Sequence, residues 1–429
     1  MEDKINKSLR YSFWDGVFAS IMAGFSEGFI SPYALAMNAS TRLIGLIASV
    51  PNLIGSILQV RSAWLVERLG SRRTLINYAV FIHAMLWMPL ILIPYIFKES
   101  RAVYVLIFYA SFVALGQIAF PPWASLMADH VSETRRGKFF GARNRIMGAI
   151  NLSCMFIAGY ILNAYKKHHP ENIFFGFTVI FSIAFISRIV SWYFLTRMHD
   201  PKITADHGDR FSLIDFMKRI TRSNFGRFVI FVAAINFGAN VAGPYFAVYM
   251  LKDLNMSYMN YAMILIASNV AGFFSMNMWG TRSDHVGNRR VLRFTSLFLP
   301  VMPILWLFSH NFYYLLLINA FGGFFWAGFN LSAFNFINDA ASPGKRTRCI
   351  AYFNVINGIA IFSGASIGGY LIRFLPPLLG YSMLSLCVIS ACLRLLAAPL
   401  CSFFKEVRQV RKVSNLELFY SVVGISPGA

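Results

Sequence analysis

Two stretches of the sequence share one polar pattern: Ala63-Trp64-Leu65-Val66-Glu67-Arg68-Leu69-Gly70-Ser71-Arg72-Arg73 and Gly280-Thr281-Arg282-Ser283-Asp284-His285-Val286-Gly287-Asn288-Arg289-Arg290. The common frame is an acid, two residues, Gly, one residue and an Arg-Arg pair. The two acids are 217 positions apart (284 − 67), and an apolar run follows each stretch. Self-similarity of this kind indicates an internal repeat.

Further residue pairs recur at nearly the same spacing. Six polar or glycine positions in the first half recur 210 positions later in the second half. They are Asp129, Arg135, Arg136, Lys138, Asn144 and Gly148, which match Asp339, Lys345, Arg346, Arg348, Asn354 and Gly358. A looser match joins Phe25, Pro32 and Tyr33 to Phe237, Pro244 and Tyr245, and Arg188 matches Arg394. These offsets predict two similar halves in parallel orientation, a repeat type found in transporters.

The composition indicates a membrane protein. Of 429 residues, 57% are hydrophobic and only 13% are charged, whereas soluble domains carry about a quarter charged residues. The net charge of +21 does not indicate nucleic-acid binding, because the basic residues form short clusters between long apolar runs. The five cysteines lie in or beside apolar segments, without the spacing of a zinc site or a disulfide framework.

Twelve apolar runs are long enough to cross a bilayer as helices. They fall at about 12–37, 43–60, 74–97, 102–127, 142–165, 173–196, 226–251, 258–279, 291–309, 312–338, 350–375 and 377–404. The first run is longer than a signal-peptide core and contains Asp15 and Glu27, so it is expected to remain in the mature protein. The predicted fold is all-α, with twelve transmembrane helices in two pseudo-symmetric six-helix bundles.

The loop charges predict the orientation. With twelve crossings, one set of alternate loops and termini carries 30 Lys and Arg residues and the other set carries 7. Because positive loops stay in the cytoplasm, both termini are predicted to be cytoplasmic.

Four segments follow from this layout: a six-helix half at 1–200, a cytoplasmic central loop at 201–225, a second six-helix half at 226–404 and a cytoplasmic tail at 405–429. Within the central loop, Phe211, Ile214, Met217 and Ile220 recur at helical spacing. This pattern predicts an amphipathic helix on the membrane surface, and a solvated linker is the alternative.

The repeated acid-x-x-Gly-x-Arg-Arg frame resembles the signature loop of the major facilitator superfamily, and the twelve-helix layout and long central loop resemble it too. Glu67, Ala63 and His285 depart from the usual signature residues, and the sequence lacks the buried helix-four arginine and the Gly-Pro pair of drug antiporters. The opening Leu9-Arg10-Tyr11-Ser12 with Asp15-Gly16 resembles a little-characterised bacterial branch. A fainter similarity is to magnetosome-membrane members proposed to handle iron.

The resemblance implies a secondary transporter that moves a small molecule or ion by alternating access. It also implies a monomer in the bacterial inner membrane, or in a membrane derived from it, with no cofactor. A membrane enzyme would need His, Cys or Ser–His clusters at one depth, and the sequence has none. A receptor or scaffold that does not transport is a further alternative.

Glu27 is the predicted coupling residue. It is the only acid near the middle of a predicted membrane helix, where a carboxylate costs several kcal/mol. Such a group can bind a proton, a cation or a cationic substrate. A protonated Glu that bonds to a neighbouring helix is the structural alternative. Asp15 lies nearer the cytoplasmic end of the same helix.

The repeated loops supply the predicted gate, in which acids and arginines hold the cytoplasmic ends together and release them. Its residues are Glu67, Arg68, Arg72, Arg73, Asp129, Arg136, Asp284, Arg289, Arg290, Asp339 and Arg346. Glu67 and Asp284 are expected near helix N-termini, where the helix dipole favours an acid. A fixed charge cluster that only sets topology is the alternative.

Helices one, four, seven and ten line the cavity in the superfamily, which implies a substrate cavity that contains Gln117, Asn236, Asn240, Trp326 and Asn330. Interhelical hydrogen bonds are the alternative role for the polar members. Arg188 and Arg394 are expected to extend toward the head groups. No resident metal is predicted, although His168, His169 and Glu171 could form an outer collar if iron is the substrate.

Overall fold

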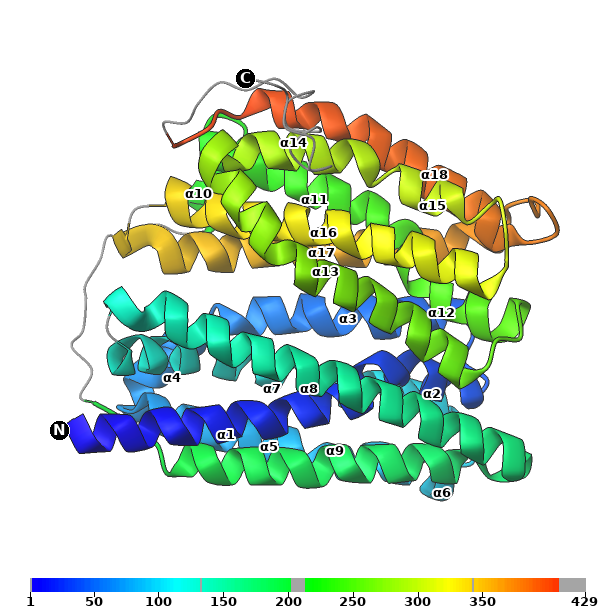
Figure 1. Ribbon diagram of the computed structural model, residues 1–429, viewed down its shortest axis with the longest axis horizontal. Helices are drawn as coiled ribbons and strands as arrows, with labels where there is room; N and C mark the ends of the chain where they lie inside the picture. The colour runs from blue at the N-terminus through cyan, green and yellow to red at the C-terminus, as the bar shows by residue number, and fades with distance from the viewer. Residues whose placement is uncertain (1, 132, 202–212, 342, 409–429) are drawn as a thin grey trace. The chain divides into compact units, whose positions relative to one another are not determined.

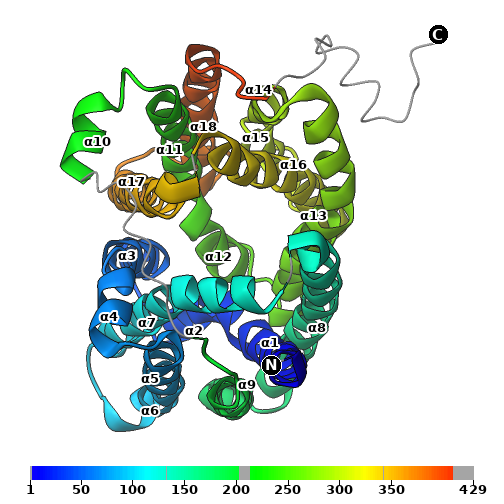
Figure 2. The same ribbon diagram turned by 90° about the vertical axis from the view of Figure 1, so that its left-hand side faces the viewer.

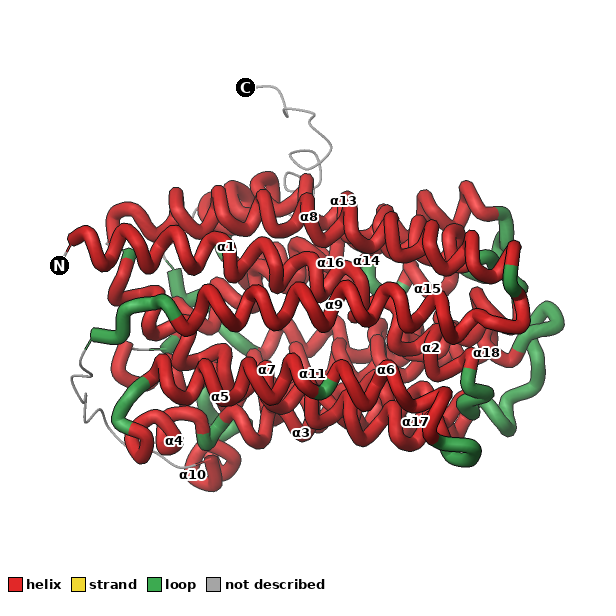
Figure 3. The backbone as a smooth tube through the Cα atoms, turned by 90° about the horizontal axis from the view of Figure 1, so that it is seen from below, coloured by secondary structure: helices red, strands yellow, loops and turns green. Residues whose placement is uncertain are grey.

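A computed structural model of the chain describes residues 2–131, 133–201, 213–341 and 343–408, and for residues 2–3, 133–138 and 343–347 it describes the backbone alone. Helices joined by short loops make up nearly all of this part of the chain (Figure 3). They form two compact units. The first unit comprises Met1–Ala205 with Pro244–Met263, and the second comprises Asp206–Gly243 with Ile264–Ala429.

The first unit contains the helices of the first repeat (Figure 1). They are α1 (Glu2–Ser26), α2 (Ile30–Ala36), α3 (Thr41–Gln59), α4 (Ser62–Leu69), α5 (Arg72–Met85), α6 (Trp87–Ile96), α7 (Arg101–His130), α8 (Glu133–His168) and α9 (Ile173–Thr196). The short α12 (Phe246–Val248) and the start of α13 also belong to this unit.

The second unit contains the helices of the second repeat. They are α10 (Leu213–Arg219), α11 (Asn224–Ala242), α13 (Tyr258–Val286), α14 (Asn288–Phe298), α15 (Val301–Leu305), α16 (Phe312–Ala340), α17 (Pro343–Leu371) and α18 (Ser382–Ala397).

Ten helical segments of the described chain are long and apolar enough to cross a membrane. The other two predicted crossings are interrupted helices: a 3₁₀ turn separates α1 from α2, and Leu299 and Pro300 separate α14 from α15. The predicted all-α fold with twelve membrane helices in two halves is confirmed.

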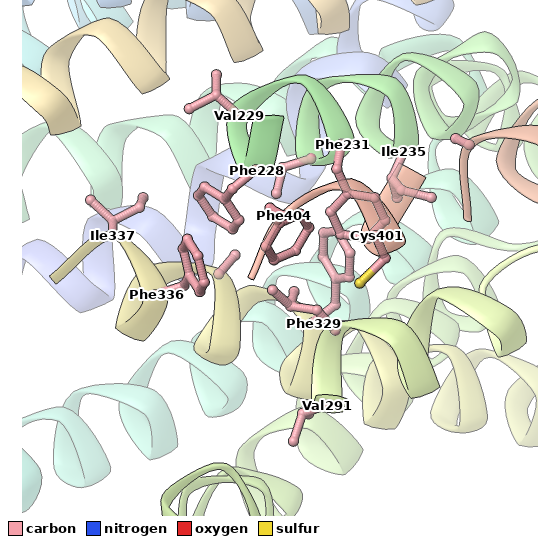
Figure 4. Packing of buried hydrophobic residues seen from close by; sticks show 14 of the residues in the cluster. Phe228, Val229, Phe231, Ile235, Val291, Phe329, Phe336, Ile337, Cys401 and Phe404 are labelled. Atoms are coloured by element: carbon pink, nitrogen blue, oxygen red, sulfur yellow. The ribbon is translucent and has the colours of Figure 1, made fainter. Parts of the chain in front are cut away.

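The same helix pairs pack in each unit. In the first, α1 packs on α8 and α9, and α5 packs on α7. In the second, α11 packs on α17 and α18, and α14 packs on α16. Figure 2 shows the helices of each unit nearly end-on. The second unit has a large aromatic core, in which Phe228 stacks on Phe336 with ring centroids 4.4 Å apart (Figure 4).

Prolines inside the helices leave backbone carbonyls without a helical hydrogen-bond donor, and side chains supply the missing donor at four of them. Proline has no N–H, so the carbonyl four residues earlier loses its helical partner, and the bilayer offers no water to replace it. Four such carbonyls accept a side-chain hydrogen bond: Gly28 from Tyr261, Leu90 from Tyr33, Ile118 from Ser62 and Leu299 from Arg394, upstream of Pro32, Pro94, Pro122 and Pro303.

Tyr33→Phe is therefore expected to destabilise the protein by about 1 kcal/mol, because it leaves the buried Leu90 carbonyl without a donor. Pro94→Ala restores a backbone N–H four residues after Leu90. In the Tyr33→Phe background it should recover most of the loss. The test is thermal unfolding in detergent of the wild type, the two single variants and the double variant. If the stability changes of the two single variants simply add in the double variant, the expectation is contradicted.

The central loop contains a short helix, α10, at the predicted place. Phe216 is its buried residue and stacks on Tyr352 with ring centroids 5.8 Å apart. Ile214 and Met217, from the predicted apolar face, are exposed. Phe211 lies outside the described residues. Phe216 also contacts Phe225, with ring centroids 5.8 Å apart, and Leu213 packs on the same core. The position of α10 at the membrane surface stays a prediction.

Candidate functional site

Glu27 lies at an interruption of the first membrane helix. α1 ends at Ser26, Glu27–Phe29 form a 3₁₀ turn, and α2 begins at Ile30. Pro32 explains the break, because it removes the hydrogen bond to the Gly28 carbonyl, which accepts from the Tyr261 hydroxyl at 3.0 Å instead. Glu27 is more exposed than its buried neighbours Ser26 and Phe29. A carboxylate that faced hydrocarbon would cost several kcal/mol.

Arg188 of α9 is the centre of a polar network inside the first unit. Its Nε donates to His83 Nδ1 at 3.1 Å, and one terminal nitrogen donates to Ser191 Oγ at 3.0 Å. Ser191 Oγ in turn donates to Asp15 Oδ1 at 2.7 Å. His83, Ser191 and Asp15 are buried, so these hydrogen bonds form away from bulk water.

Arg143 of α8 approaches Asp15 from another side. One terminal nitrogen lies 3.9 Å from Asp15 Oδ2 and donates to the Ser12 carbonyl at 3.2 Å. Gly16 makes this approach possible, since a Cβ there would lie 2.4 Å from the same nitrogen. Asp15 is therefore close to two arginines: Arg143 lies within ion-pair distance, and Arg188 is connected to Asp15 by the hydrogen bonds of Ser191.

Side chains from α1, α5, α8 and α9 thus share one polar network around Arg188. The sequence singled out Glu27 and noted Asp15, but it did not indicate that Arg188 connects Asp15 to His83.

The second repeat provides an internal comparison. Its arginine, Arg394, donates to the Leu299 carbonyl at 2.9 Å and to the Ala239 carbonyl at 3.4 Å. Ala239 is the repeat partner of Glu27, at the offset of 212 that joins Phe25 to Phe237. The arginine position is therefore common to both repeats, whereas the carboxylate is present in the first alone. The fold is built at this position without an acid, which favours a functional role for Glu27.

The prediction that both arginines extend toward the head groups is wrong. Arg394 is 4% exposed, and Arg188 is half-buried. Each guanidinium finds hydrogen-bond acceptors inside its own unit, so neither needs the polar surface.

A second group of charges lies at the start of α5. Arg72 is buried, with one terminal nitrogen 2.7 Å from Asp129 Oδ2 and its Nε 3.4 Å from Asp200 Oδ1. Asp200 Oδ2 also accepts from Ser71 Oγ at 2.7 Å and from the Arg73 backbone N–H at 3.1 Å. Asp200, which the sequence analysis missed, thus holds the N-terminus of α5.

The second unit repeats this arrangement with a different cation. Arg408, beyond α18, lies 2.8 Å from Asp284 and 2.7 Å from Asp339. Hydrogen bonds to Asp339, and then to Asp284, raise the pKa of Arg408 above its ordinary value, so it stays charged. Glu406 accepts from the Arg289 backbone N–H at 2.7 Å, at the start of α14.

These contacts correct the expected placement of two acids. Glu67 lies in the last turn of α4 and Asp284 in the last turn of α13, not at helix N-termini. The motif glycines follow those helices with a positive φ, 64° at Gly70 and 88° at Gly287, a backbone conformation that favours glycine. Gly70 has the left-handed helical conformation that commonly ends a helix. Asp200 and Glu406 occupy the N-terminal positions instead, where the helix dipole favours an acid.

The other predicted gate residues have varied surroundings. Glu67 and Arg68 are exposed, and Arg68 lies over the Trp64 ring at 5.4 Å. Arg73 donates to the Met198 carbonyl, Arg289 donates to the carbonyls of Cys401 and Ser402, and Arg290 is half-buried. The side chains of Arg136 and Arg346 lie outside the described part of the structure.

The predicted cavity residues are mostly amides. In the second unit, Asn236 Nδ2 donates to Asn357 Oδ1 at 2.9 Å, and Asn240 Nδ2 donates to the Asn236 carbonyl at 2.9 Å. Asn330 is exposed and Trp326 is half-buried. In the first unit, Gln117 is half-buried beside Gly55. Asn357 was not predicted, because a lone Asn in an apolar run gives no distinctive signal.

No group of three or more His, Cys, Asp and Glu side chains that could hold a metal occurs among the described residues. His168, His169 and Glu171 are described and exposed. The suggested iron collar is therefore not formed.

Sequence comparison decides the family. The model of the Major Facilitator Superfamily matches residues 16–299 and 228–419. This chain belongs to the Major Facilitator Superfamily. No match is found among curated proteins. As a superfamily member with ten apolar spans in its described part, the chain is a multi-pass membrane protein.

Solved structures of other superfamily-like transporters share the fold. The nucleoside transporter NupG is 13% identical with a TM-score of 0.70, over 92% of this chain and 99% of that one. A bacterial homologue of the iron transporter ferroportin, in an inward-facing state, is 14% identical with a TM-score of 0.66, over 92% and 98%. A bacterial metal transporter is 14% identical with a TM-score of 0.62, over 93% and 97%. At these identities the likeness shows the fold alone.

Proposed function

We propose that this protein is a secondary active transporter that moves a small polar solute by alternating access between its two six-helix halves, driven by protons through Glu27. The observation that carries the proposal is an exposed carboxylate at a break in the first membrane helix. A carboxylate in that setting can take up and release a proton as its access to water changes. The positive loops support an orientation with both termini in the cytoplasm. The proposed location is the bacterial inner membrane, and a monomer suffices for this mechanism.

The isolation of Glu27 argues for a proton rather than a metal ion at this residue. No group of three or more His, Cys, Asp and Glu side chains that could hold a metal occurs among the described residues, so a divalent cation at Glu27 would face one carboxylate and keep an uncompensated positive charge. A proton removes the carboxylate charge without adding a new one. Free iron is for this reason the weaker alternative, in spite of the two metal-related structures that share the fold.

The amide residues support a neutral solute with several hydroxyl or carbonyl groups. Asn236, Asn240, Asn330 and Gln117 donate and accept hydrogen bonds but carry no charge. In the described part of the second unit they lie in helices α11 and α16, whose predicted membrane portions contain no acid. Nucleosides and sugars fit this chemistry, and uridine is a reasonable first probe.

The gate is proposed to use the two charge groups at the helix ends. Arg72 with Asp129 and Asp200, and Arg408 with Asp284 and Asp339, each tie helix ends that are distant in sequence. Contacts of this kind can break and re-form as the access state changes.

Uptake into proteoliposomes with an imposed pH gradient tests the function. We expect one member of a panel of uridine, glucose and an amino acid to accumulate above its level in empty vesicles, and to lose that accumulation when the gradient is dissipated. Free and chelated iron are measured in parallel and should not accumulate. Iron uptake would establish the alternative substrate, and uptake of nothing by a folded protein would favour a receptor or scaffold.

A further inference from the structure

Aromatic side chains of α1 and α9 form a cluster on the surface of the first unit. The ring of Phe194, on α9, lies at its centre. It contacts three rings of α1, with centroids 6.4 Å from Tyr11, 6.3 Å from Trp14 and 6.0 Å from Phe18. Tyr193 adds a fifth ring, 5.6 Å from Phe194. Trp14 and Tyr193 are each 48% exposed, so the cluster is open to the surroundings of the protein.

Two exposed arginines, Arg10 and Arg197, lie at one edge of this cluster. α1 and α9 lie side by side (Figures 1 and 2) and run antiparallel, with the His199 N–H donating to Ser8 Oγ at 2.9 Å. Arg10 follows Ser8 by two residues and Arg197 precedes His199 by two, so the arginines lie at nearly the same level. Trp14 is four residues beyond Arg10, about 6 Å along the helix axis. The rings therefore begin one helical turn from the two cations, toward the middle of the helices.

The charge of these arginines is not neutralised by the helices that carry them. One terminal nitrogen of Arg197 donates to the Tyr193 hydroxyl at 3.3 Å, and the guanidinium carbon lies 5.1 Å from the ring centroid. Neither Arg10 nor Arg197 forms an ion pair within the described part of the chain. α9 contains no acid, and Asp15 of α1 is buried and accepts from Ser191. An arginine has five N–H donors, so this edge can bind an anion from outside the protein.

The second repeat folds without this cluster. At the offsets that relate the two halves, the residues in place of Trp14, Phe18, Phe194 and Arg197 are Gly226, Ile230, Leu400 and Phe403. The corresponding pair of helices, α11 and α18, packs together all the same. The rings and the arginine are therefore an addition to the first half, which favours a binding function over a requirement of the fold.

We propose that this face binds one anionic phospholipid, with its phosphate on Arg10 and Arg197 and its glycerol and upper acyl chains against the rings. Arg197 lies three residues before Asp200, at the same end of the unit as the basic loop before α5. Loop charge predicts that this end faces the cytoplasm, where the leaflet carries anionic lipids. A phospholipid fits both parts of the face, because rings of Trp and Tyr favour the boundary between head groups and acyl chains. The site does not depend on which solute the protein moves.

Native mass spectrometry of the full chain in detergent counts bound lipids directly. With added phosphatidylglycerol the wild type should retain a tightly bound lipid that equal amounts of phosphatidylcholine do not replace. Arg10→Gln and Arg197→Gln should each weaken this binding about fivefold, and the double variant about 25-fold, since each removes one basic residue near the membrane surface. Arg197→Lys keeps the charge and should bind better than Arg197→Gln. Trp14→Ala should also weaken binding, because the lipid loses the ring beside its acyl chains.

Arg222→Gln is the matched control, because Arg222 is exposed and takes the place of Arg10 in the second repeat. It should bind phosphatidylglycerol like the wild type. The melting temperatures of the arginine variants without added lipid should equal that of the wild type, since both arginines are exposed.

Unchanged phosphatidylglycerol binding in the double arginine variant would overturn the inference, and so would equal retention of the two lipids by the wild type. A dimer that persists when lipid is added would overturn it too, and would assign the face to a second copy of the chain. A wild type that transports solute but retains no phosphatidylglycerol would remove the lipid site and leave the transporter assignment standing.

Discussion

Glu27→Gln is expected to abolish accumulation of the transported solute against its gradient, a loss of at least about tenfold in steady-state level for a gradient of one pH unit. Glutamine keeps the shape and hydrogen-bonding capacity of the side chain but cannot take up a proton. The accumulation ratio in proteoliposomes, measured for the solute that the wild type concentrates, checks the result. Downhill exchange of the same solute should persist, because the scaffold of the site is unchanged.

Two controls separate coupling from folding in this experiment. Glu99→Gln removes an exposed loop carboxylate and should accumulate solute like the wild type. The melting temperature of Glu27→Gln should stay at or above that of the wild type, since a neutral amide replaces an acid in a membrane helix. Full accumulation by Glu27→Gln would remove this residue from the coupling mechanism.

Arg72→Met and Arg408→Met are expected to differ strongly in stability, although the two arginines occupy comparable charge groups. The side chain of Arg72 is 7% exposed, and its removal leaves Asp129 and Asp200 without their cation, at a cost of about 2 kcal/mol. The side chain of Arg408 is 35% exposed, and those of its two acids, Asp284 and Asp339, are 68% and 17% exposed. Solvent reaches the guanidinium and screens the attraction, so the loss is at most about 1 kcal/mol.

Thermal unfolding in detergent at low and high salt distinguishes the two cases. The melting temperature of Arg72→Met should fall by several degrees at both salt concentrations, since the side chains of Arg72 and Asp200 are only 7% and 11% exposed and salt screens their attraction little. The smaller effect of Arg408→Met should shrink further in high salt. Equal destabilisation by the two variants would contradict the difference in burial from which this expectation follows.

The sequence predicted the architecture well because membrane crossing imposes a strong and simple pattern. Apolar runs at 173–196 and 312–338 agree closely with α9 (Ile173–Thr196) and α16 (Phe312–Ala340). The interruptions were harder, since the runs at 12–37 and 291–309 are continuous in hydropathy. A helix can break where a proline removes a backbone donor, as at Pro32. The carbonyl that loses its donor then accepts a hydrogen bond from another helix, and the sequence does not show which one.

The candidate site was only partly predictable for a related reason. Glu27 is recognisable in the sequence as an acid in an apolar run, whereas the contacts of Arg188 depend on which helices face it. Asp200 and Glu406 had a usable signal, because they are separated by 206 positions, the same offset that relates Arg188 to Arg394. Comparing the two halves at this offset beyond the end of the sixth predicted helix would have paired Asp200 with Glu406.

The pairing of prolines with side-chain donors constrains how this sequence can change over generations. A proline that arrives at position 94 before a hydroxyl exists at position 33 would leave the buried Leu90 carbonyl without a donor. A tyrosine that arrives first leaves the helical partner of that carbonyl in place. The same order holds for Ser62 before Pro122 and for Arg394 before Pro303. Each proline is thus expected to follow its donor, because two steps leave a carbonyl unpaired: gain of the proline first, and loss of the donor alone.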